Sequence, residues 1–306
     1  MMQKSLFDPP DDRRKSKVST VTRKNGVVNV ASVPMRSPFR YPGGKTWLVP
    51  QIRRWLTAQG GPEKELIELF AGGGIVGLTA VFENLVGHAT LVELDEDVAA
   101  VWQTILNGDA AWLANRIVTF ELTAESARHA IAQRENSLRD RAFATIVKNR
   151  VNRGGILAEG ASFVKHGENG KGIQSRWYPT TLKRRMMEIH QLQDRFSFIW
   201  GDAFTVLRQN LERADAVFFI DPPYVKAGGR LYNHSEIDHL ALFELADRAQ
   251  GNFLMTYDNH PEIREFAEQY GFDIRYVPMK TTHHAKKFEL LIGRNLDWVD
   301  GVETHD

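Results

Sequence analysis

The chain contains short apolar stretches separated by segments whose apolar positions repeat with helical spacing. Seven stretches predict strands: 65–70, 89–95, 196–200, 216–220, 252–257, 273–279 and 288–294. Helices are expected between most of them, including 97–108, 236–249 and 261–270. Strands that alternate with helices are typical of a parallel, doubly wound α/β sheet. The last two stretches are joined by a short polar link and therefore predict a terminal antiparallel pair.

The alternation is interrupted between residues 123 and 195. Helical patterns over 124–135 and 139–151 precede a glycine-rich, basic segment that fits neither helix nor strand. We therefore expect one large α/β domain with a mainly helical insertion. The predicted parts are a disordered basic arm over 1–36, a first α/β part over 37–122, the insertion over 123–195, and a second α/β part of the same domain over 196–306.

Composition excludes several kinds of site. The 306 residues include no cysteine, which removes disulfides, thiolate metal sites and cysteine nucleophiles. No apolar stretch approaches the roughly 18 residues that span a bilayer, and the first residues lack the apolar core of a signal peptide. We therefore expect a cytoplasmic protein without a membrane segment.

Charge is uneven along the chain, although the net charge is only +1. Residues 1–36 hold eight Lys or Arg against three Asp, and residues 146–185 hold nine Lys or Arg against two Glu. The second group lies inside the folded part and indicates a polyanionic partner. A solvated basic face is the alternative.

A glycine-rich turn follows the first predicted strand. Gly72, Gly74 and Gly77 in FAGGGIVG have the G-x-G-x-x-G spacing, and Glu93 lies 21 positions after Gly72 at the end of the next strand. Glycines let a ligand approach the backbone, and the acid can accept hydrogen bonds from both ribose hydroxyls. The pattern predicts an adenosine-bearing cofactor, and it leaves open a nicotinamide dinucleotide or S-adenosylmethionine (AdoMet).

The strand at 216–220 ends in Asp-Pro-Pro-Tyr. Ligands of a parallel sheet lie beyond the carboxyl ends of its strands, so this corner shares an edge with the glycine turn. The Asp221 carboxylate and the Pro222 carbonyl could accept both N–H groups of an exocyclic amine and free its lone pair, while Pro222 and Pro223 keep the corner rigid. The Tyr224 ring could stack on a base taken out of its helix, and its hydroxyl is assigned no role.

The chemistry of this corner separates the alternatives. A hydride-transfer enzyme has no use for such a corner, and the absence of cysteine excludes methylation at C5 of cytosine. A turn that only ends a strand is the remaining alternative, and the position of the corner at the ligand edge of the sheet argues against it.

Several motifs in one order resemble the Dam-type DNA adenine N6-methyltransferases over 37–295. FRYPGGK resembles the family's first AdoMet loop, ELFAGGG its glycine loop, GDAF the loop for the cofactor adenine, and DPPY its catalytic loop. NRVNRGGI resembles the segment between the cofactor and catalytic motifs. The resemblance implies a Rossmann-like, AdoMet-dependent methyltransferase that modifies N6 of a flipped adenine at a specific site in double-stranded DNA.

The resemblance also implies site residues. The catalytic set is Asp221, Pro222, Pro223 and Tyr224. The AdoMet-binding set is Tyr41, Lys45, Phe70, Gly72, Gly74, Glu93, Asp202 and Asp221. Asp202 could instead cap a helix, Lys45 could be solvated, and Tyr41 could pack on the core.

The basic segment and its flanks supply the expected DNA contacts. The DNA-binding set is Arg40, Lys148, Asn149, Arg150, Asn152, Arg153, Lys183, Arg184 and Arg185, in which the cations contact phosphates and the amides, with Gln174, could read base edges. No metal site is expected, because His283 and His284 have no acidic motif beside them. The expected partner is double-stranded DNA, without an obligate protein partner.

Other functions stay open at this point. The first is the same chemistry on RNA or at N4 of cytosine, and the second is a nicotinamide-dependent oxidoreductase. The third is a catalytically silent DNA-binding protein that keeps the fold, against which the intact Asp221, Tyr224, Lys45 and Glu93 argue.

Overall fold

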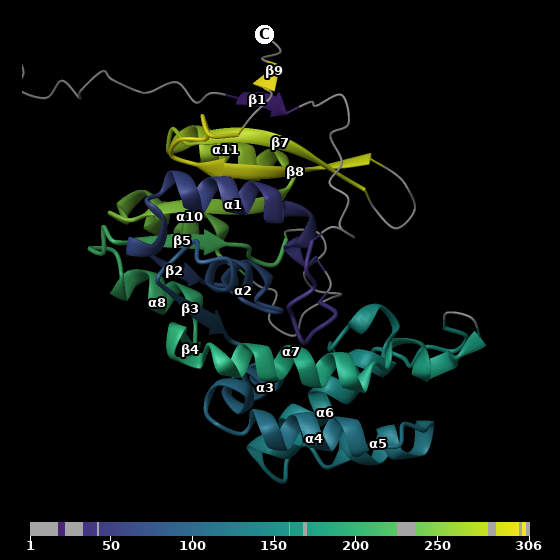
Figure 1. The fold of residues 1–306 in the computed structure, drawn as a ribbon. Helices are drawn as coiled ribbons and strands as arrows, with labels where there is room; N and C mark the ends of the chain where they lie inside the picture. Colours follow the sequence, from purple (N-terminus) through teal and green to yellow (C-terminus); the bar gives the residue numbers. More distant parts are fainter. Residues whose placement is uncertain are drawn as a thin grey trace, which may run out of the picture.

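A computed structural model describes residues 18–21, 33–41, 43–158, 160–167, 170–224, 237–280, 286–299 and 302–303. These residues form a nine-stranded sheet with helices on both faces (Figure 1). The strand order across the sheet is β4-β3-β2-β5-β6-β8-β7-β1-β9. The strands are β1 Val18–Val21, β2 Glu65–Glu68, β3 His88–Glu93, β4 Phe196–Trp200, β5 Ala216–Ile220, β6 Asn252–Asp258, β7 Asp273–Lys280, β8 Lys286–Gly293 and β9 Val302–Glu303.

The five strands β4, β3, β2, β5 and β6 are parallel. The direction of the chain across the sheet reverses beside β2, which pairs with β3 on one side and with β5 on the other. Ligands of doubly wound sheets bind at such a switch point, beyond the carboxyl ends of the strands. The glycine turn follows β2 and residues 221–224 follow β5, so both motifs lie at the switch point. The predicted Rossmann-like α/β class is confirmed.

The predicted terminal antiparallel pair is also confirmed. β7 and β8 pair antiparallel from Asp273↔Gly293 to Lys280↔Lys286. β8 also pairs antiparallel with β6, so it lies between β6 and β7 in the sheet. This arrangement brings Glu289 of β8 beside the end of β6, next to the switch point.

Helices cover the two faces of the sheet. One face carries α1 Val49–Ala58, α2 Ile75–Phe82 and α3 Glu96–Leu106, and the other carries α8 Ala203–Gln209, α10 His239–Arg248 and α11 Pro261–Gln269. Successive side chains of a strand point to opposite faces. In β5, Phe219 packs near Trp55 of α1 with ring centroids 6.4 Å apart, whereas Phe218 lies in the second core with Phe243 of α10. Burial on both faces explains why β5 is a continuous apolar run.

Four more helices form a block at the β4 end of the sheet (Figure 1). They are α4 Ala110–Thr119, α5 Ala124–Ala132, α6 Leu138–Val151 and α7 Pro179–Gln191, and they are called the helical block below. Thr123 and Ser126 form a reciprocal capping box at α5, and Ser137 caps α6. α4 packs on α7 and α6, so it is included in the block although it precedes residue 123. Among the described residues, no helix is long and apolar enough to cross a membrane.

The expected disorder of residues 1–36 is wrong for the parts of this arm that the structure describes. Val18–Val21 forms β1 and pairs parallel with β7. Its β-branched residues favour a strand, and β7 offers an edge on which a strand can pair. Val33 is buried, with 4% of its surface exposed. Residues 1–17 and 22–32 lie outside the described residues.

Candidate active site

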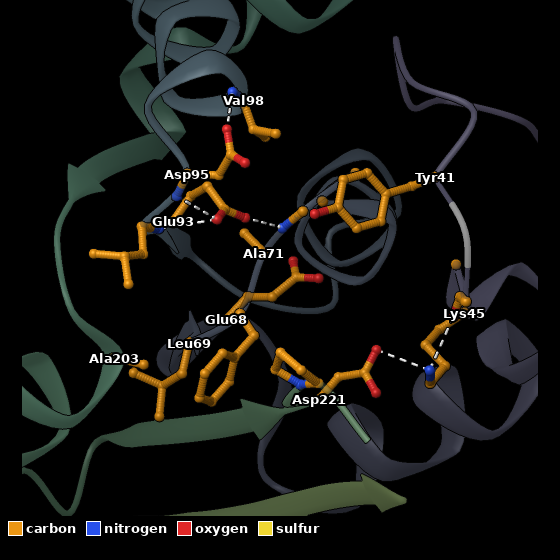
Figure 2. Close-up of a pocket in the computed structure, with 18 of the residues that line it drawn as sticks. Tyr41, Lys45, Glu68, Leu69, Ala71, Glu93, Asp95, Val98, Ala203 and Asp221 are labelled. Atoms are coloured by element: carbon orange, nitrogen blue, oxygen red, sulfur yellow. Dashed lines mark hydrogen bonds and ion pairs between the residues drawn. The ribbon is translucent and has the colours of Figure 1, made fainter. Parts of the chain in front are cut away.

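A cavity of about 720 Å³ lies at the switch point of the sheet. Its walls come from residues 35–41 and 43–46, from 68–75 at the end of β2, from 93–95 at the end of β3, from 201–204 at the start of α8, and from the corner after β5. Figure 2 shows the carboxylates of Glu68, Glu93 and Asp221 around this space, with Lys45 beside Asp221. The motifs that resemble the Dam-type enzymes therefore meet around one cavity.

The glycine turn has the backbone that its sequence predicts. Gly72 and Gly74 have φ values of 47° and 62°, in the left-handed region that favours glycine. The indole N–H of Trp102 donates to the Gly72 carbonyl at 2.9 Å and holds the turn against α3. A Cβ atom on Gly77 would lie 2.6 Å from Leu91, so this third glycine allows α2 to pack closely on β3.

Glu93 ends β3 and binds three backbone N–H groups. Its Oε2 accepts from Gly72 at 2.8 Å, and its Oε1 accepts from Leu94 and Asp95 at 2.9 Å each. Burial, followed by the neighbouring charge of Asp95, raises the pKa of Glu93 to about 7 against the opposing effect of these N–H donors. The carboxylate is therefore fixed at the cavity wall, between the glycine turn and α3, where a ribose acid is expected.

Glu68 is a buried acid that the sequence-based prediction missed. Its side chain lines the cavity with 3% exposure, and Oε2 accepts from the Gly77 N–H at 2.7 Å. Burial raises the pKa of Glu68 to about 8, and the charges of Asp221 and Glu93 add to this rise. A glutamate inside the apolar stretch ELIELF was the signal that could have identified it. Such a group is suited to a ligand that carries positive charge.

Asp221 stands directly after β5 and both of its oxygens have partners. Oδ1 accepts from the Thr256 hydroxyl at 2.7 Å, and Oδ2 lies 2.8 Å from Nζ of Lys45. Lys45 is 3% exposed and also donates to the Gly43 carbonyl at 2.9 Å. Burial opposes the charged form of Lys45, but the carboxylates of Asp221 and Glu289 outweigh it and raise the pKa of Lys45. Lys45 is therefore a buried cation rather than a solvated lysine.

The Tyr224 ring is packed inside the corner. It stacks on Tyr257 with ring centroids 6.3 Å apart at 29°, and the ammonium of Lys45 lies 5.1 Å from its centroid. A cation over the face of an aromatic ring is attracted by the electron density of that face. Tyr224 is thus held by protein contacts on the side that faces β6.

The remaining predicted cofactor residues lie around the same cavity. Tyr41 packs on the glycine turn, because a Cβ on Gly72 would meet its ring at 2.6 Å. Phe70 lines the cavity. Asp202 lines the cavity and also caps α8, since its side chain accepts from the N–H and the hydroxyl of Thr205 at 2.8 and 2.9 Å. Both interpretations of Asp202 are therefore compatible with the structure.

A comparison with known families places the chain. Residues 41–282 match the model of the D12 class N6 adenine-specific DNA methyltransferases. The chain belongs to this family. It is an AdoMet-dependent adenine N6-methyltransferase, and DNA is its substrate. The predicted family, activity and cofactor are confirmed, and the family does not favour RNA or N4 of cytosine as the target.

Solved structures share part of the methyltransferase's architecture at low similarity. A candidate RNA methyltransferase from Pyrococcus horikoshii is 9% identical with a TM-score of 0.41, over 86% of this chain and 92% of that chain. An AdoMet-dependent methyltransferase from Agrobacterium tumefaciens is 8% identical with a TM-score of 0.38, over 82% of this chain and 62% of that chain. No curated protein sequence matches the chain. The activity therefore rests on the family match.

The methyltransferase does not present Asn149 and Asn152 to a base. Asn149 is fully buried; its Oδ1 accepts from the Arg40 N–H at 2.9 Å, and its Nδ2 donates to the carbonyls of Arg40 and Gly155 at 2.9 and 2.8 Å. Asn152 is 1% exposed and donates to the Ile156 carbonyl at 2.8 Å. The structure contradicts the expected base contacts of both residues, because their amides bind buried backbone groups that need partners.

Arg150 is also an internal contact rather than an exposed phosphate ligand. It is 4% exposed and its guanidinium donates to the Pro38 carbonyl. Burial lowers the pKa of Arg150 to about 9, and neighbouring arginines, first among them Arg185, add to this effect. Arg185 is partly buried and donates to the Ser37 carbonyl at 3.0 Å. Both arginines therefore attach the start of the cofactor segment, residues 37–45, to the helical block.

The other expected DNA-binding residues reach the surface. Arg153, Lys183 and Arg184 are exposed, and Arg40 and Lys148 are partly exposed. Gln174 is exposed and donates to the Leu122 carbonyl at 3.1 Å. These residues stay candidates for DNA contacts.

Within the part of the chain that the structure describes, no group of three or more His, Asp or Glu side chains is arranged to hold a metal ion. His283 and His284 lie outside the described residues.

Proposed function

We propose that this methyltransferase modifies N6 of an adenine that is flipped out of double-stranded DNA at a specific sequence, and that it acts in the cytoplasm. The observation that carries the proposal is the position of Asp221, which lies in the cavity wall with 20% of its side chain exposed. An adenine that remains paired inside a duplex cannot bring its amino group to a carboxylate at this depth.

Asp221 is the group that activates the target amine. The lone pair of N6 is delocalised into the purine ring, so the amine is a poor nucleophile. A carboxylate at Asp221 and the carbonyl of Pro222 accept the two N–H groups, pull the nitrogen toward sp³ geometry and stabilise the positive charge that develops on it. AdoMet supplies the methyl group from its sulfonium. Lys45 and Thr256 fix the carboxylate before the base arrives, and each oxygen keeps a further lone pair for the amine.

The cavity fits AdoMet by its backbone and by its charge. The left-handed glycines give close access to the backbone, and Glu93 is placed to accept the ribose hydroxyls. Glu68 and Glu93 have raised pKa values in the free protein, because burial of each carboxylate is not compensated by a positive charge. The positive groups of AdoMet supply that charge. Tyr41, Phe70 and Asp202 complete the walls against the cofactor.

The helical block and the connection between α6 and α7 supply the DNA surface in this proposal. The segment from 146 to 185, which runs from α6 through this connection into α7, carries nine Lys or Arg against two Glu. Arg153, Lys183 and Arg184 are exposed, so they can approach phosphates without rearrangement of the core. Gly154 and Gly155 line the cavity directly beyond Arg153, which brings this surface to the mouth of the catalytic site.

The test compares Asp221→Ala with wild type in single-turnover methylation of a duplex, followed by identification of the modified base by mass spectrometry. We expect the rate to fall by about 100-fold or more, because the acceptor of the amine is lost. Asp194→Asn, an exposed acid far from the cavity, serves as the matched control. A wild-type rate for Asp221→Ala would refute the catalytic assignment.

A fluorescence assay tests base flipping. A 2-aminopurine at the target position should gain fluorescence when the enzyme binds a duplex, because the base leaves its stack. Equal methylation of duplex and single-stranded oligonucleotides would show that double-stranded DNA is not the preferred substrate.

A further inference from the structure

Glu289 is a buried carboxylate that the mechanism above does not use. It lies in β8, opposite Asp258 at the end of β6, and only 6% of the residue is exposed. Burial of an acid inside a sheet is unfavourable unless a specific partner stabilises its charge. Its partners therefore show what the side chain does.

Those partners are two residues of the catalytic site. Oε2 of Glu289 lies 3.8 Å from Nζ of Lys45. The side chain of Tyr224 lies close enough to the Glu289 carboxylate to favour its ionised form. Burial raises the pKa of Glu289, and the charge of Lys45 and the hydroxyl of Tyr224 oppose that rise. Both partners thus stabilise the ionised carboxylate.

The two contacts reach the two ends of the catalytic corner. Asp221 is the first residue of Asp-Pro-Pro-Tyr and Tyr224 is the last. Nζ of Lys45 lies 2.8 Å from Oδ2 of Asp221. The ammonium of Lys45 also lies 5.1 Å from the centroid of the Tyr224 ring. Asp221, Glu289 and the Tyr224 ring therefore gather around Lys45, and Glu289 comes from a strand far away in the sequence.

The charge of Glu289 is not needed to neutralise Lys45. Asp221 already binds Nζ of Lys45 at 2.8 Å, and the Gly43 carbonyl accepts a second hydrogen bond at 2.9 Å. A second buried carboxylate adds desolvation cost, and an apolar residue of similar size would fill the same space without it. A role in the geometry of the site accounts for the charge better than a role in stability.

We propose that Glu289 is a positioning residue for methyl transfer, which orients Lys45 and the Tyr224 hydroxyl and thereby fixes both ends of the catalytic corner. It touches neither substrate nor cofactor in this assignment. The proposal rests on the proposed function of Asp221. It also gives the Tyr224 hydroxyl a role, whereas the sequence alone assigned none.

The first test compares Glu289→Gln with wild type. Glutamine keeps the size of the side chain and an acceptor oxygen but removes the charge that orients Lys45. We expect the single-turnover methylation rate to fall by roughly 10- to 100-fold, as for a catalytic group displaced by a fraction of an ångström. Affinity for sinefungin, affinity for duplex DNA, 2-aminopurine fluorescence and the unfolding temperature should change little, because the loss lies in the chemical step.

Asp258→Asn is the matched control. It removes a carboxylate directly across the ladder from Glu289, and it should methylate like wild type. A role for Glu289 in stability alone predicts a different pattern, in which the unfolding temperature, the two affinities and the rate fall together. That pattern, or a wild-type rate for Glu289→Gln, overturns the proposal.

The second test approaches the contact from Tyr224 and covers the case in which Glu289→Gln folds poorly. Tyr224→Phe keeps the ring and removes only the hydroxyl, and it should also slow methylation while sinefungin binding is retained. In a double-mutant cycle, the combined loss should be smaller than the product of the single losses, because both changes remove one contact. Independent losses would show that the two side chains do not act together.

These outcomes are separable from failure of the proposed function. If Asp221→Ala keeps the wild-type rate, the catalytic assignment fails whatever Glu289 does. If Asp221→Ala is inactive while Glu289→Gln is fully active, only the role of Glu289 is refuted.

Discussion

Replacement of Asn149 by alanine tests how the helical block holds the cofactor segment. The Asn149 side chain makes three hydrogen bonds of 2.8 to 2.9 Å, two with the backbone of Arg40 and one with the carbonyl of Gly155. Arg40 lies one residue before Tyr41, which packs on the glycine turn, and five before Lys45, which binds Asp221. The perturbation therefore reaches the cofactor site through the backbone.

The size of the effect follows from these three bonds. A typical intramolecular hydrogen bond contributes about 1 kcal/mol, and buried groups left without partners are more costly. Asn149→Ala removes the side-chain partner of the Arg40 N–H, of the Arg40 carbonyl and of the Gly155 carbonyl, so we expect about 3 kcal/mol of destabilisation. If about half of this free energy is lost from the ordered position of residues 37–45, which AdoMet analogues need for binding, their affinity falls by roughly tenfold.

The assay measures sinefungin affinity by calorimetry, the unfolding transition, and the sequence preference of methylation. Asn152→Ala is the matched control, because Asn152 is as deeply buried but its side-chain amide donates to Ile156 rather than to the cofactor segment. The control should unfold only about 1 kcal/mol more easily and bind sinefungin normally. Unchanged sinefungin binding together with relaxed sequence preference for Asn149→Ala would refute this reasoning and restore Asn149 as a base-reading residue.

Three further predictions concern the cofactor turn and the DNA surface. The pKa of Glu93 is raised to about 7, so its carboxyl is partly protonated near neutrality, whereas ribose hydroxyls need the ionised form as acceptor. Sinefungin affinity, measured by calorimetry, should therefore rise from about pH 6 to about pH 8. Glu93→Gln should remove most of this rise. Gly72→Ala should weaken sinefungin binding, because the added Cβ would lie 2.6 Å from the Tyr41 ring. Gly108 also has a positive φ but no atom within 4 Å of the added Cβ, so Gly108→Ala should lower stability without affecting sinefungin binding. Replacing three exposed cations by alanine should flatten the log–log salt dependence of DNA binding in filter assays, by about 0.9 in slope for each phosphate that is no longer neutralised. These cations are Arg153, Lys183 and Arg184.

The centre of the sheet could be predicted from the sequence because its strands are buried on both faces. Such strands are continuous apolar runs, and the predicted range 216–220 coincides with β5. The predicted range 196–200 coincides with β4, an edge strand whose aromatic and β-branched residues favour a strand even though most of them are exposed. Helix α7 was not predicted. Its buried residues Leu182, Met186 and Ile189 have helical spacing, but they are separated by a run of basic residues that was interpreted as a DNA surface. Packing against α4 stabilises α7, and this tertiary contact cannot be read from the local sequence pattern.

The candidate site was predicted as far as its motifs extend. Tyr41, Lys45, Glu93 and Asp221 meet at the cavity because the ends of parallel strands share an edge. Their roles in binding AdoMet and the target base stay predictions. Glu289 was missed for a different reason, since its role depends on the pairing of β8 between β6 and β7, and strand order across a sheet is not visible in periodicity.

The errors in the DNA-binding set have a common physical cause. Positive charge and amide groups were assigned to the surface because such residues are mostly exposed. Asn149 and Arg150 instead lie inside α6 and bind carbonyls of residues 38–40, a segment more than a hundred positions earlier in the chain. A segment without regular structure must find partners for its buried backbone groups, and these side chains supply them.

The distribution of charge in the fold bears on which part of the DNA enters the cavity. Glu68, Glu93 and Asp221 line the inner site, and Glu289 lies beside it, where Lys45 is bound by Asp221 and Glu289. The helical block carries the excess of positive charge, so phosphates are attracted to its surface and repelled from the acidic cavity. A neutral base is not subject to that repulsion, and its exocyclic amine is a donor that the carboxylate of Asp221 can accept. The same separation favours positively charged AdoMet inside the cavity, so the proposed cofactor and the phosphates of DNA are attracted to different parts of the protein.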